Sequence, residues 1–359
     1  MVEYRPVDRE PLKTGHRIHF AEAGTLEAVP SGSVQLVVTS PPYPMIEMWD
    51  QCFAEQDPQI GEAMDKRRGW QAFERMHALL DRTWKSVHRV LAPGGLACIN
   101  IGDATRTLDG VFVLYPNHAR ILSYLMKLRF NPLPAILWRK QTNAPNKFMG
   151  SGMLPAGAYV TLEHEYVLIV RKGDKRFFGS EAGKQRRSES AFFWEERNQW
   201  FSDVWFDLKG TVQSISNGKT RERSGAFPFE LAYRLISMFS LKGDLVLDPF
   251  LGTGTTMLAA MASARNSAGY ERDQNLRDEI VEKAEGIVPA ANARIRERLE
   301  SHSAFVNERF RERGKFGYQN RCYGFPVVTR QETGLYLNPL VEIRRTGEEG
   351  FEAEHGLPT

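Results

Sequence analysis

Short apolar runs alternate with amphipathic stretches along most of the chain. An apolar run bounded by turn residues predicts a buried strand, and apolar positions three and four residues apart predict a helix. The predicted strands cover residues 18–20, 34–38, 96–101, 134–138, 166–170, 245–248 and 267–270. The predicted helices cover residues 70–91, 115–128, 228–241 and 257–264. This alternation predicts an α/β fold in which helices pack on a mostly parallel sheet.

Two segments between these elements carry predictions of their own. Residues 25–29 predict a brief helical stretch that leads into the strand at residues 34–38. Residues 44–69 are polar, with Asp57-Pro58 and the cluster at residues 66–69 as breakers, and they predict an irregular, mobile loop. Because this loop follows the carboxyl end of a predicted strand, we expect it to cover a pocket there.

The composition is that of a globular chain. Of its 359 residues, 42% are hydrophobic and 25% are charged, and no apolar run approaches the length that spans a bilayer. Residues 1–6 lack the apolar core of a signal peptide, so we expect a cytoplasmic protein with no membrane partner. Cys52, Cys98 and Cys322 are too far apart for a disulfide framework or a zinc site. The net charge of +3 permits a polyanionic partner without requiring one.

The first candidate site is the pentapeptide at residues 39–43, directly after the strand at residues 34–38. In a parallel sheet, ligands bind at the carboxyl ends of the strands. Two prolines stiffen this backbone and leave carbonyls free to accept hydrogen bonds beside a tyrosine ring. We expect Ser40 and the Pro41 carbonyl to accept from a planar NH2 group while Tyr43 stacks on it, which suits a nucleobase. The alternative is a turn that ends a strand beside a half-buried tyrosine.

The second candidate site is residues 248–256, a strand end followed by a glycine-bearing turn and a helix start. Gly252 and Gly254 let a ligand approach the backbone beside the amides of a helix N-terminus. Glu271 ends the next predicted strand, roughly 20 residues further on, where an acidic residue binds the ribose of a nucleotide. No lysine follows Gly254, which excludes a P-loop, and the third glycine of a dinucleotide fingerprint is absent. We therefore expect a nucleoside site, with a structural tight turn as the alternative.

Acidic residues near two other predicted strands are also candidate ligands. Glu22 follows the strand at residues 18–20 and is placed to meet the adenine or ribose of a nucleotide, with a solvated loop carboxylate as the alternative. His164 stands between Glu163 and Glu165, but no further ligand is spaced to complete a metal site. We therefore expect no metal, and interpret His164 as a packed strand residue.

Residues 171–223 combine cations with aromatic rings. Basic residues outnumber acidic ones at residues 171–187, aromatic residues cluster at residues 192–206, and a further basic cluster follows at residues 219–223. This mixture predicts a nucleic-acid surface, and a solvated face over a small aromatic core is the alternative. The residues that we expect to contact the nucleic acid are Lys140, Asn143, Lys172, Arg186, Arg187, Lys219, Arg221 and Arg223.

With both candidate sites in this order, the chain resembles the beta-class amino-methyltransferases of DNA. Residues 40–43 match their catalytic tetrapeptide, and residues 248–256 match their S-adenosylmethionine loop. Residues 203–205 and 226–231 are similar to further motifs, and the resemblance covers residues 16–286. The catalytic residues that it implies are Ser40, Pro41, Pro42 and Tyr43. It implies S-adenosyl-L-methionine as cofactor, bound by Glu22, Thr39, Phe227, Pro228, Asp248, Pro249, Phe250, Gly252, Gly254, Thr255, Thr256 and Glu271.

The resemblance also implies an architecture. It is a Rossmann-like, circularly permuted fold with a mostly parallel seven-stranded sheet, helices on both faces and a smaller target-recognition insertion. The strand at residues 18–20 would then lie beside the strand that ends at Glu271. The implied parts are a catalytic half (1–170), a target-recognition region (171–223), a cofactor-binding half (224–289) and a charged C-terminal extension (290–359). We expect the arginine-rich helix that opens the extension to pack back on the domain, with a DNA contact or a dimer surface as alternatives.

The tetrapeptide also carries an expectation about the substrate. In this family its serine form is associated with the N4 amine of cytosine and its aspartate form with the N6 amine of adenine. We therefore expect direct methyl transfer to cytosine N4 in a base flipped out of double-stranded DNA, with adenine as the alternative. No cysteine follows a proline, which argues against transfer to carbon 5 of cytosine. Further alternatives are an RNA or protein-amide methyltransferase and an inactive DNA-binding protein. The expected setting is either a restriction–modification system, with a cognate restriction endonuclease as partner, or an orphan modification system without one. The chain is expected to be a monomer or a homodimer.

Overall fold

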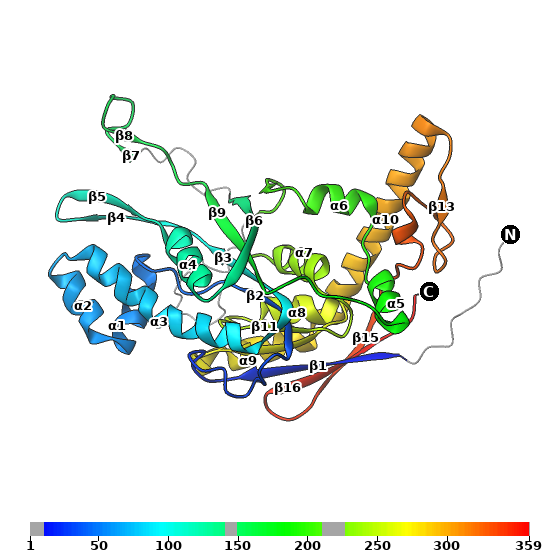
Figure 1. Ribbon diagram of the computed structural model, residues 1–359, viewed down its shortest axis with the longest axis horizontal. Helices are drawn as coiled ribbons and strands as arrows, with labels where there is room; N and C mark the ends of the chain where they lie inside the picture. Colours follow the sequence, from blue (N-terminus) through cyan, green and yellow to red (C-terminus); the bar gives the residue numbers. More distant parts are fainter. Residues whose placement is uncertain (1–10, 141–148, 210–226, 359) are drawn as a thin grey trace.

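One large mixed sheet runs through the protein. The computed structural model describes residues 11–140, 149–209 and 227–358. Within these ranges the sheet has ten strands in the order β10–β6–β9–β3–β2–β11–β12–β1–β16–β15 (Figure 1). They are β1 (Leu12–His19), β2 (Val34–Thr39), β3 (Leu91–Ile101), β6 (Phe130–Arg139), β9 (His164–Lys172), β10 (Val204–Trp205), β11 (Leu245–Asp248), β12 (Asn266–Tyr270), β15 (Leu340–Arg345) and β16 (Gly350–His355). All seven strands predicted from the apolar runs are among them.

The strand order agrees with the permuted, mostly parallel fold. β3, β2, β11, β12 and β1 are parallel neighbours, and β9 runs antiparallel between β6 and β3. β1 pairs with β12, with Ile18 opposite Gly269, so the N-terminal strand lies beside the strand that precedes Glu271, as expected. The sheet is larger than seven strands because β10 extends one edge and the β15–β16 hairpin extends the other. In β16, buried Phe351 and Ala353 alternate with glutamates, a pattern that a search for apolar runs overlooks.

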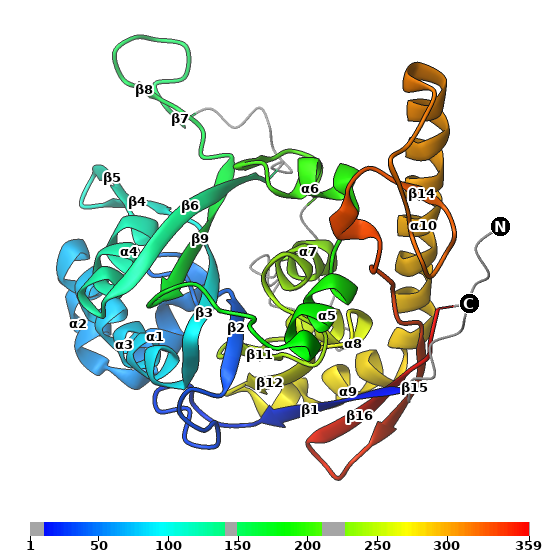
Figure 2. The same cartoon turned by 45° about the vertical axis from the view of Figure 1, so that its right-hand side comes forward.

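Helices cover both faces of the sheet (Figure 2). On one face lie α1 (Asp50–Gln56), α2 (Pro58–Asp65), α3 (Gly69–Val90) and α4 (Asn117–Lys127), and on the other α7 (Phe229–Phe239), α8 (Thr255–Ala262), α9 (Arg277–Glu285) and α10 (Ile287–Arg313). In β2, Val37 belongs to the core under α3, whereas Leu36 and Val38 belong to the core under α7 and α8. Burial on both faces explains the continuous apolar runs of the central strands. None of the helices in the described ranges is long and apolar enough to cross a membrane.

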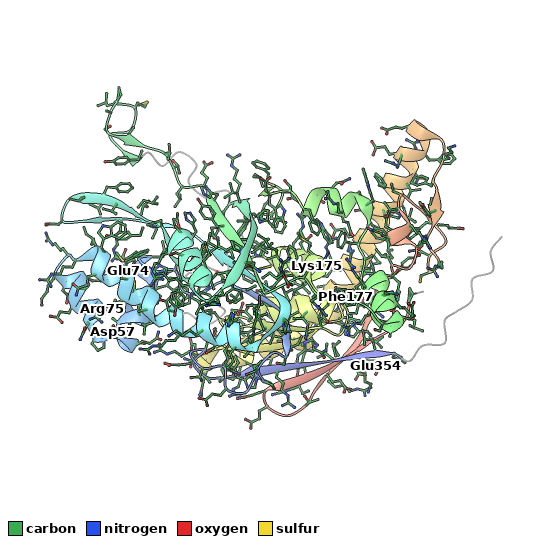
Figure 3. The ribbon with its side chains drawn as sticks, in the orientation of Figure 1. Asp57, Glu74, Arg75, Lys175, Phe177 and Glu354 are labelled. Atoms are coloured by element: carbon green, nitrogen blue, oxygen red, sulfur yellow. The ribbon has the colours of Figure 1, made fainter. Side chains whose placement is uncertain are left out.

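Residues 44–69, expected to be an irregular loop, are largely helical. A 3-10 turn at Glu47–Trp49 leads into α1 and α2. Asp57 caps α2 by accepting a hydrogen bond from a backbone amide, and Pro58 occupies the first turn. The dipeptide expected to act as a breaker is therefore a helix start. Arg75 of α3 also donates to Asp57 at 2.9 Å and ties the two helices together (Figure 3).

Residues 25–29, expected to be a brief helix, form turns instead. Leu26 is buried with a φ of 49°, a left-handed conformation that a right-handed helix does not allow. Arg89 of α3 donates to the carbonyls of Thr25 and Leu26 at 3.0 and 2.8 Å. The turn is thus held against α3 before the chain enters β2.

A second lobe beside the sheet is built from two distant parts of the chain. One part contributes α6 (Trp194–Trp200), which follows α5 (Glu181–Glu189) in the chain, and the other contributes α10 (Figure 1). Arg298 of α10 donates to both carboxylate oxygens of Glu196 at 2.5 and 2.7 Å. Trp200 and Trp205 are buried, so these two aromatic residues of the 192–206 cluster build a core rather than an exposed surface. The expected domain boundaries stay a prediction.

Candidate active site

The two candidate motifs meet at the carboxyl edge of the sheet. β2 and β11 are parallel neighbours, with Val37 opposite Leu247, so they end side by side. Thr39 ends β2 and donates a hydrogen bond to Asp248, which ends β11, with 2.5 Å between Oγ1 and Oδ1. The sheet therefore joins the tetrapeptide (residues 40–43) to the glycine turn (residues 248–256).

The Asp248 carboxylate is buried, and both of its oxygens are engaged by the protein. Besides the bond from Thr39, it accepts from Thr256 Oγ1 at 2.6 Å and from the Phe250 amide at 3.0 Å. Burial raises the pKa of Asp248 to about 6, while the hydrogen-bond donors oppose that shift. The carboxylate fixes the conformation of the glycine turn. Its expected role in cofactor binding would therefore be indirect, through the conformation of that turn.

Two glycines and one glutamate define the course of the glycine turn. Gly252 and Gly254 have φ angles of 56° and 88°, which a residue with a Cβ rarely adopts. No atom lies within 4 Å of the position that a Cβ of Gly252 would take, so the turn borders open space there. Glu271, directly after β12, accepts from the amides of Gly252 and Asp273, each at 2.8 Å. Glu271 thus braces the turn from the neighbouring strand.

A cavity of about 480 Å³ lies between the tetrapeptide and the glycine turn. This volume is in the range of pockets that hold small-molecule cofactors. The predicted residues that line it are Glu22, Ser40, Pro41, Pro42, Tyr43, Phe227, Asp248, Pro249, Phe250, Gly252, Thr255 and Glu271. Of the other predicted cofactor residues, Thr39 and Thr256 contact the lining through Asp248, Gly254 caps α8, and Pro228 caps α7. The structure therefore brings both predicted residue sets to one cavity.

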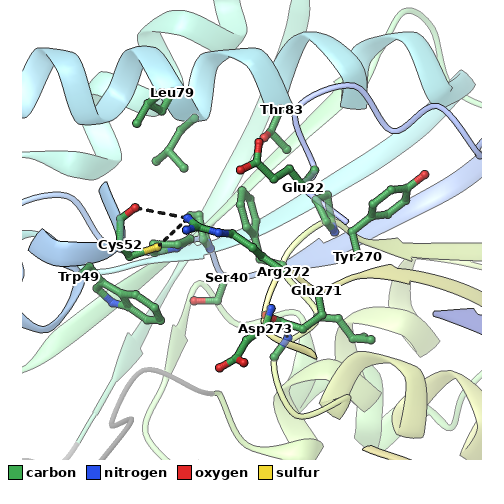
Figure 4. A pocket seen from close by; sticks show the side chains of 18 of the residues that line it. Glu22, Ser40, Trp49, Cys52, Leu79, Thr83, Tyr270, Glu271, Arg272 and Asp273 are labelled. Carbon is green, nitrogen blue, oxygen red and sulfur yellow. Dashed lines mark hydrogen bonds between the residues drawn. The ribbon is translucent and has the colours of Figure 1, made fainter. Parts of the chain in front are cut away.

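Helix α1 closes one side of the cavity (Figure 4). Cys52, Phe53 and Glu55 of this helix belong to the lining. Arg272 reaches across to α1, where it donates to Glu55 Oε2 at 2.8 Å and to the Cys52 carbonyl at 3.5 Å. The Arg272 and Glu55 side chains are 42% and 49% exposed, so their ion pair is weak. The segment expected to cover the pocket does so as a helix, and the arginine that holds it was not predicted from the sequence.

Ser40 and Tyr43 belong to a buried hydrogen-bond network. The Ser40 hydroxyl donates to the Tyr43 hydroxyl oxygen at 3.1 Å, and Tyr43 donates to Glu165 Oε2 at 2.9 Å. Asn100 Nδ2 donates to the Tyr43 oxygen at 2.8 Å and to Glu165 Oε2 at 2.6 Å. Burial and the Glu165 charge raise the pKa of Tyr43 well above its ordinary value, so Tyr43 keeps its proton. Because the Ser40 hydroxyl donates its hydrogen bond to Tyr43, the lone pairs of the Ser40 oxygen are left to accept hydrogen bonds from a ligand.

Glu165 is a site residue that the sequence did not reveal. It lies at the carboxyl edge because its neighbour Tyr166 pairs with the last residue of β3. Lys140, just after β6, donates to its second carboxylate oxygen at 2.9 Å. In the sequence Glu165 was considered only as a neighbour of His164. In the structure the ring of His164 packs edge-on against Tyr166. No group of three metal-binding side chains occurs in the described ranges. The available signal was a carboxylate at the start of β9, the antiparallel strand that begins beside the tetrapeptide.

The residues expected to contact DNA divide between the two edges of the sheet. Lys140 lies at the carboxyl edge, beside the tetrapeptide network. Because β9 runs antiparallel, the chain after it emerges at the opposite edge, where Lys172 donates to two backbone carbonyls at the end of α3. Arg186 of α5 pairs there with Asp244 at 3.4 Å, and Arg187 lies on the same helix. Lys172, Arg186 and Arg187 are thus not brought to the cavity. Asn143, Lys219, Arg221 and Arg223 lie outside the described residues.

The chain is similar to known DNA methyltransferases. The model of a DNA methylase family of the N6/N4 type matches residues 34–282. The Type II methyltransferase M.MthZI of Methanothermobacter thermautotrophicus is 50% identical over 327 residues, which are 91% of each chain. The Type II methyltransferase M.MjaI of Methanocaldococcus jannaschii is 48% identical over 76% of this chain and 92% of its own. The crystal structure of TTHA0409, a protein of Thermus thermophilus, with S-adenosyl-L-methionine matches with a TM-score of 0.57 at 33% identity, over 75% of this chain and 94% of that one.

Proposed function

Because the chain belongs to the N6/N4 family of DNA methylases, which use S-adenosyl-L-methionine, we propose that it methylates the N4 amine of cytosine in a base flipped out of double-stranded DNA. Family membership makes the protein a DNA methyltransferase, and the choice between the two exocyclic amines is the proposed step. The N6 amine of adenine is the second candidate, because its two protons suit the same acceptors.

The cavity suits the cofactor. Glu22 and Glu271 place carboxylates in the cavity lining, where ribose hydroxyls would donate to them. Leu79, Leu80 and Phe250 offer apolar surface for an adenine ring. When bound, the cofactor supplies a methyl group on a positively charged sulfur. The tetrapeptide lines the same cavity and is placed to hold the acceptor amine.

The hydrogen bond from Ser40 to Tyr43 is the observation that carries the proposal. An exocyclic amine is a poor nucleophile because its lone pair is delocalised into the ring. The proton of the Ser40 hydroxyl is already used in its bond to Tyr43. Ser40 and the Pro41 carbonyl would therefore accept hydrogen bonds from the two amine protons and favour a pyramidal nitrogen. The lone pair of that nitrogen then points away from its protons and is available to attack the methyl carbon, and the methylated nitrogen afterwards releases one of its two protons to solvent. Positioning and electrostatics supply the acceleration, with no covalent intermediate on the protein.

One further feature favours cytosine N4, and another argues against carbon 5 of cytosine. Serine in the first position of the tetrapeptide is the form that the resemblance associates with cytosine. Transfer to carbon 5 would use a cysteine nucleophile, but Cys52, which lines the cavity, follows a glutamine, and burial raises the pKa of Cys98 far above its ordinary value. Extruding the base costs a few kcal/mol, and stacking on Tyr43 would return about 1 to 3 kcal/mol.

The relatives support a biological context for this activity. M.MthZI and M.MjaI are named Type II methyltransferases and match most of this chain. We therefore propose that the protein acts in a restriction–modification system with a cognate restriction endonuclease, and an orphan modification system is the alternative. Plasmid DNA from cells that express the protein should resist that nuclease, and cleavage at every site of fully modified DNA would contradict the assignment.

The product of the reaction distinguishes the candidates. Purified protein is incubated with duplex DNA and labelled S-adenosyl-L-methionine, and the digested nucleosides are separated by mass spectrometry. N4-methylcytosine is the expected product, whereas N6-methyladenine would establish the second candidate. Parallel incubations with RNA and with total protein test the other substrate classes. Single-molecule sequencing of the modified DNA then gives the sequence context.

A further inference from the structure

Glu165 acts on the tetrapeptide without lining the cavity. The residue is 9% exposed, and its carboxylate is joined to Ser40 through the hydroxyl of Tyr43. We propose that Glu165 is a positioning residue that fixes Ser40 as a hydrogen-bond acceptor for the target amine. It does so by accepting the hydrogen bond that the Tyr43 hydroxyl donates. The Tyr43 oxygen can then only accept the hydrogen bond from Ser40. This inference rests on the proposed transfer to an exocyclic amine.

The direction of these bonds follows from what each group can do. A hydroxyl donates one hydrogen bond and accepts two, and an ionised carboxylate only accepts. Tyr43 must therefore donate to Glu165, and one of its lone pairs is taken by Asn100 Nδ2 at 2.8 Å. The remaining lone pair of the Tyr43 oxygen can only accept a hydrogen bond, and the Ser40 hydroxyl donates it. The Ser40 oxygen then presents lone pairs, and no proton, to the cavity.

Lys140 makes the direction sensitive to a single isosteric substitution. Its ammonium group, which can only donate, holds Glu165 Oε1 at 2.9 Å. In Glu165→Gln, Lys140 retains the carbonyl oxygen and leaves the amide NH2 facing Tyr43. That NH2 group also faces Asn100 Nδ2, which lies 2.6 Å from Glu165 Oε2, so one of these two donors must move away. Tyr43, which then accepts from an amide instead of donating to a carboxylate, turns its own proton to Ser40. The Ser40 proton is pushed toward the target amine, where it repels the amine hydrogens.

The test is single-turnover methyl transfer to duplex DNA, measured with affinity for S-adenosyl-L-methionine. Glu165→Gln should slow transfer on the order of 100-fold, as expected when a preorganised hydrogen bond is misdirected. Its cofactor affinity and circular dichroism should equal those of the unmodified protein. Glu163→Gln is the matched control, because Glu163 pairs with Arg139 at the surface and should transfer methyl groups at the normal rate. Glu165→Asp, which keeps an acceptor-only carboxylate, should recover part of the rate.

The Tyr43→Phe background separates this role from a merely structural one. Without the phenol hydroxyl, Ser40 is free to rotate, so Tyr43→Phe should be faster than Glu165→Gln. Adding Glu165→Gln to Tyr43→Phe should then change nothing further. The inference is overturned if Glu165→Gln costs the same factor in both backgrounds, if Tyr43→Phe is as slow as Glu165→Gln, or if Glu165→Gln is fully active. Failure of the unmodified protein to methylate any exocyclic amine would instead overturn the proposed function.

Discussion

Thr39 and Asp248 are 209 residues apart in the chain, yet their side chains share a buried hydrogen bond of 2.5 Å at the ends of neighbouring strands. One residue leads directly into the tetrapeptide, and the other opens the glycine turn. The bond therefore sets the spacing between the groups that hold the acceptor and the groups that hold the donor. Errors in this spacing should affect binding and transfer together.

We expect Thr39→Val to weaken both the fold and the cofactor site. The substitution keeps the side-chain shape but removes one donor from a buried carboxylate, which costs about 1 to 3 kcal/mol in the free energy of unfolding. Urea denaturation and titration calorimetry with S-adenosyl-L-methionine measure the two effects. Thr39→Ser keeps the hydroxyl and serves as the control. Cofactor affinity unchanged in Thr39→Val would show that the bond does not shape the site.

Asp248 should link stability to pH in an unusual direction. Its pKa is about 6 in the folded protein and near 3.8 in the unfolded chain, so between these values the folded state holds more protons. The contribution of Asp248 to the free energy of unfolding therefore falls as pH rises from about 4 to about 6, and it is constant above that. Relative to Asp248→Asn, the unmodified protein should lose on the order of 3 kcal/mol over this window. Denaturation curves of both proteins at several pH values test this.

Asp248→Ala should abolish the binding of S-adenosyl-L-methionine. Removing the carboxylate frees Thr39, Thr256 and the Phe250 amide at once, so the glycine turn loses the anchor that shapes it. Calorimetry should give no heat of binding, while the far-ultraviolet circular dichroism remains that of a folded protein. Normal affinity in this variant would show that the cofactor does not depend on the glycine turn.

The ion pair between Arg272 and Glu55 should control how fast the cofactor leaves. Arg272→Ala frees α1 to move away from the cavity, so dissociation of S-adenosyl-L-methionine should accelerate. Because the pair is exposed, the loss should be at most about 1 kcal/mol, or roughly fivefold in the dissociation constant, and smaller at high salt. Stopped-flow fluorescence measures the rate. Lys13→Ala, which breaks the exposed pair with Glu352 away from the cavity, should leave the rate unchanged.

Tyr43→Ala should lose methyl transfer, whereas Tyr43→Phe should retain a good part of it. Both variants lose the hydroxyl, but only alanine removes the ring that stacks on the flipped base, a contribution of about 1 to 3 kcal/mol. A labelled methyl-transfer assay on duplex DNA compares the two. Equal activity of Tyr43→Ala and the unmodified protein would remove the stacking role.

A buried pair of histidines should make the protein sensitive to acid. Burial lowers the pKa of His16 to about 3 and that of His355 to about 4, and Thr14 Oγ1 lies 2.9 Å from Nε2 of each. Below pH 6.5 the unfolded chain takes up protons that the folded protein cannot, so stability is lost as pH falls toward 4. The melting temperature should drop over this window. The drop should be smaller in His16→Gln, measured against each protein's value at about pH 7.5.

The fold was predictable because the central strands have a clear pattern in the sequence. Strands buried on both faces, such as β2 and β11, must be continuously apolar, and that pattern survives in the sequence. Short or half-buried strands such as β10 and β16 lack it. The helices of residues 47–65 were not predicted because their composition is polar. Asp57 is a residue type that caps helices, but its contribution becomes clear only in the fold, where Arg75 of α3 lies beside it.

The candidate site was predictable where its residues are consecutive. Ser40 to Tyr43 and the glycine turn each form a contiguous motif with its own chemistry. Glu165 was not recognised, because its role depends on β9 running antiparallel beside β3, which no local pattern states. The same antiparallel strand carries Lys172 to the edge opposite the cavity. Charge composition located a basic segment, and topology decided which of its described cations could reach the site.

The position of β1 has a consequence for how the protein is made. This strand pairs with β12 on one side and with β16 on the other, so its partners are residues 266–270 and 350–355. Long-range pairing of this kind is slow and leaves strand edges exposed until the partner arrives. During translation β1 gains its second partner only after residues 350–355 have left the ribosome. The ten-stranded sheet is therefore completed only when β15 and β16 have emerged, and until then a nascent chain has an open strand edge that chaperones would recognise.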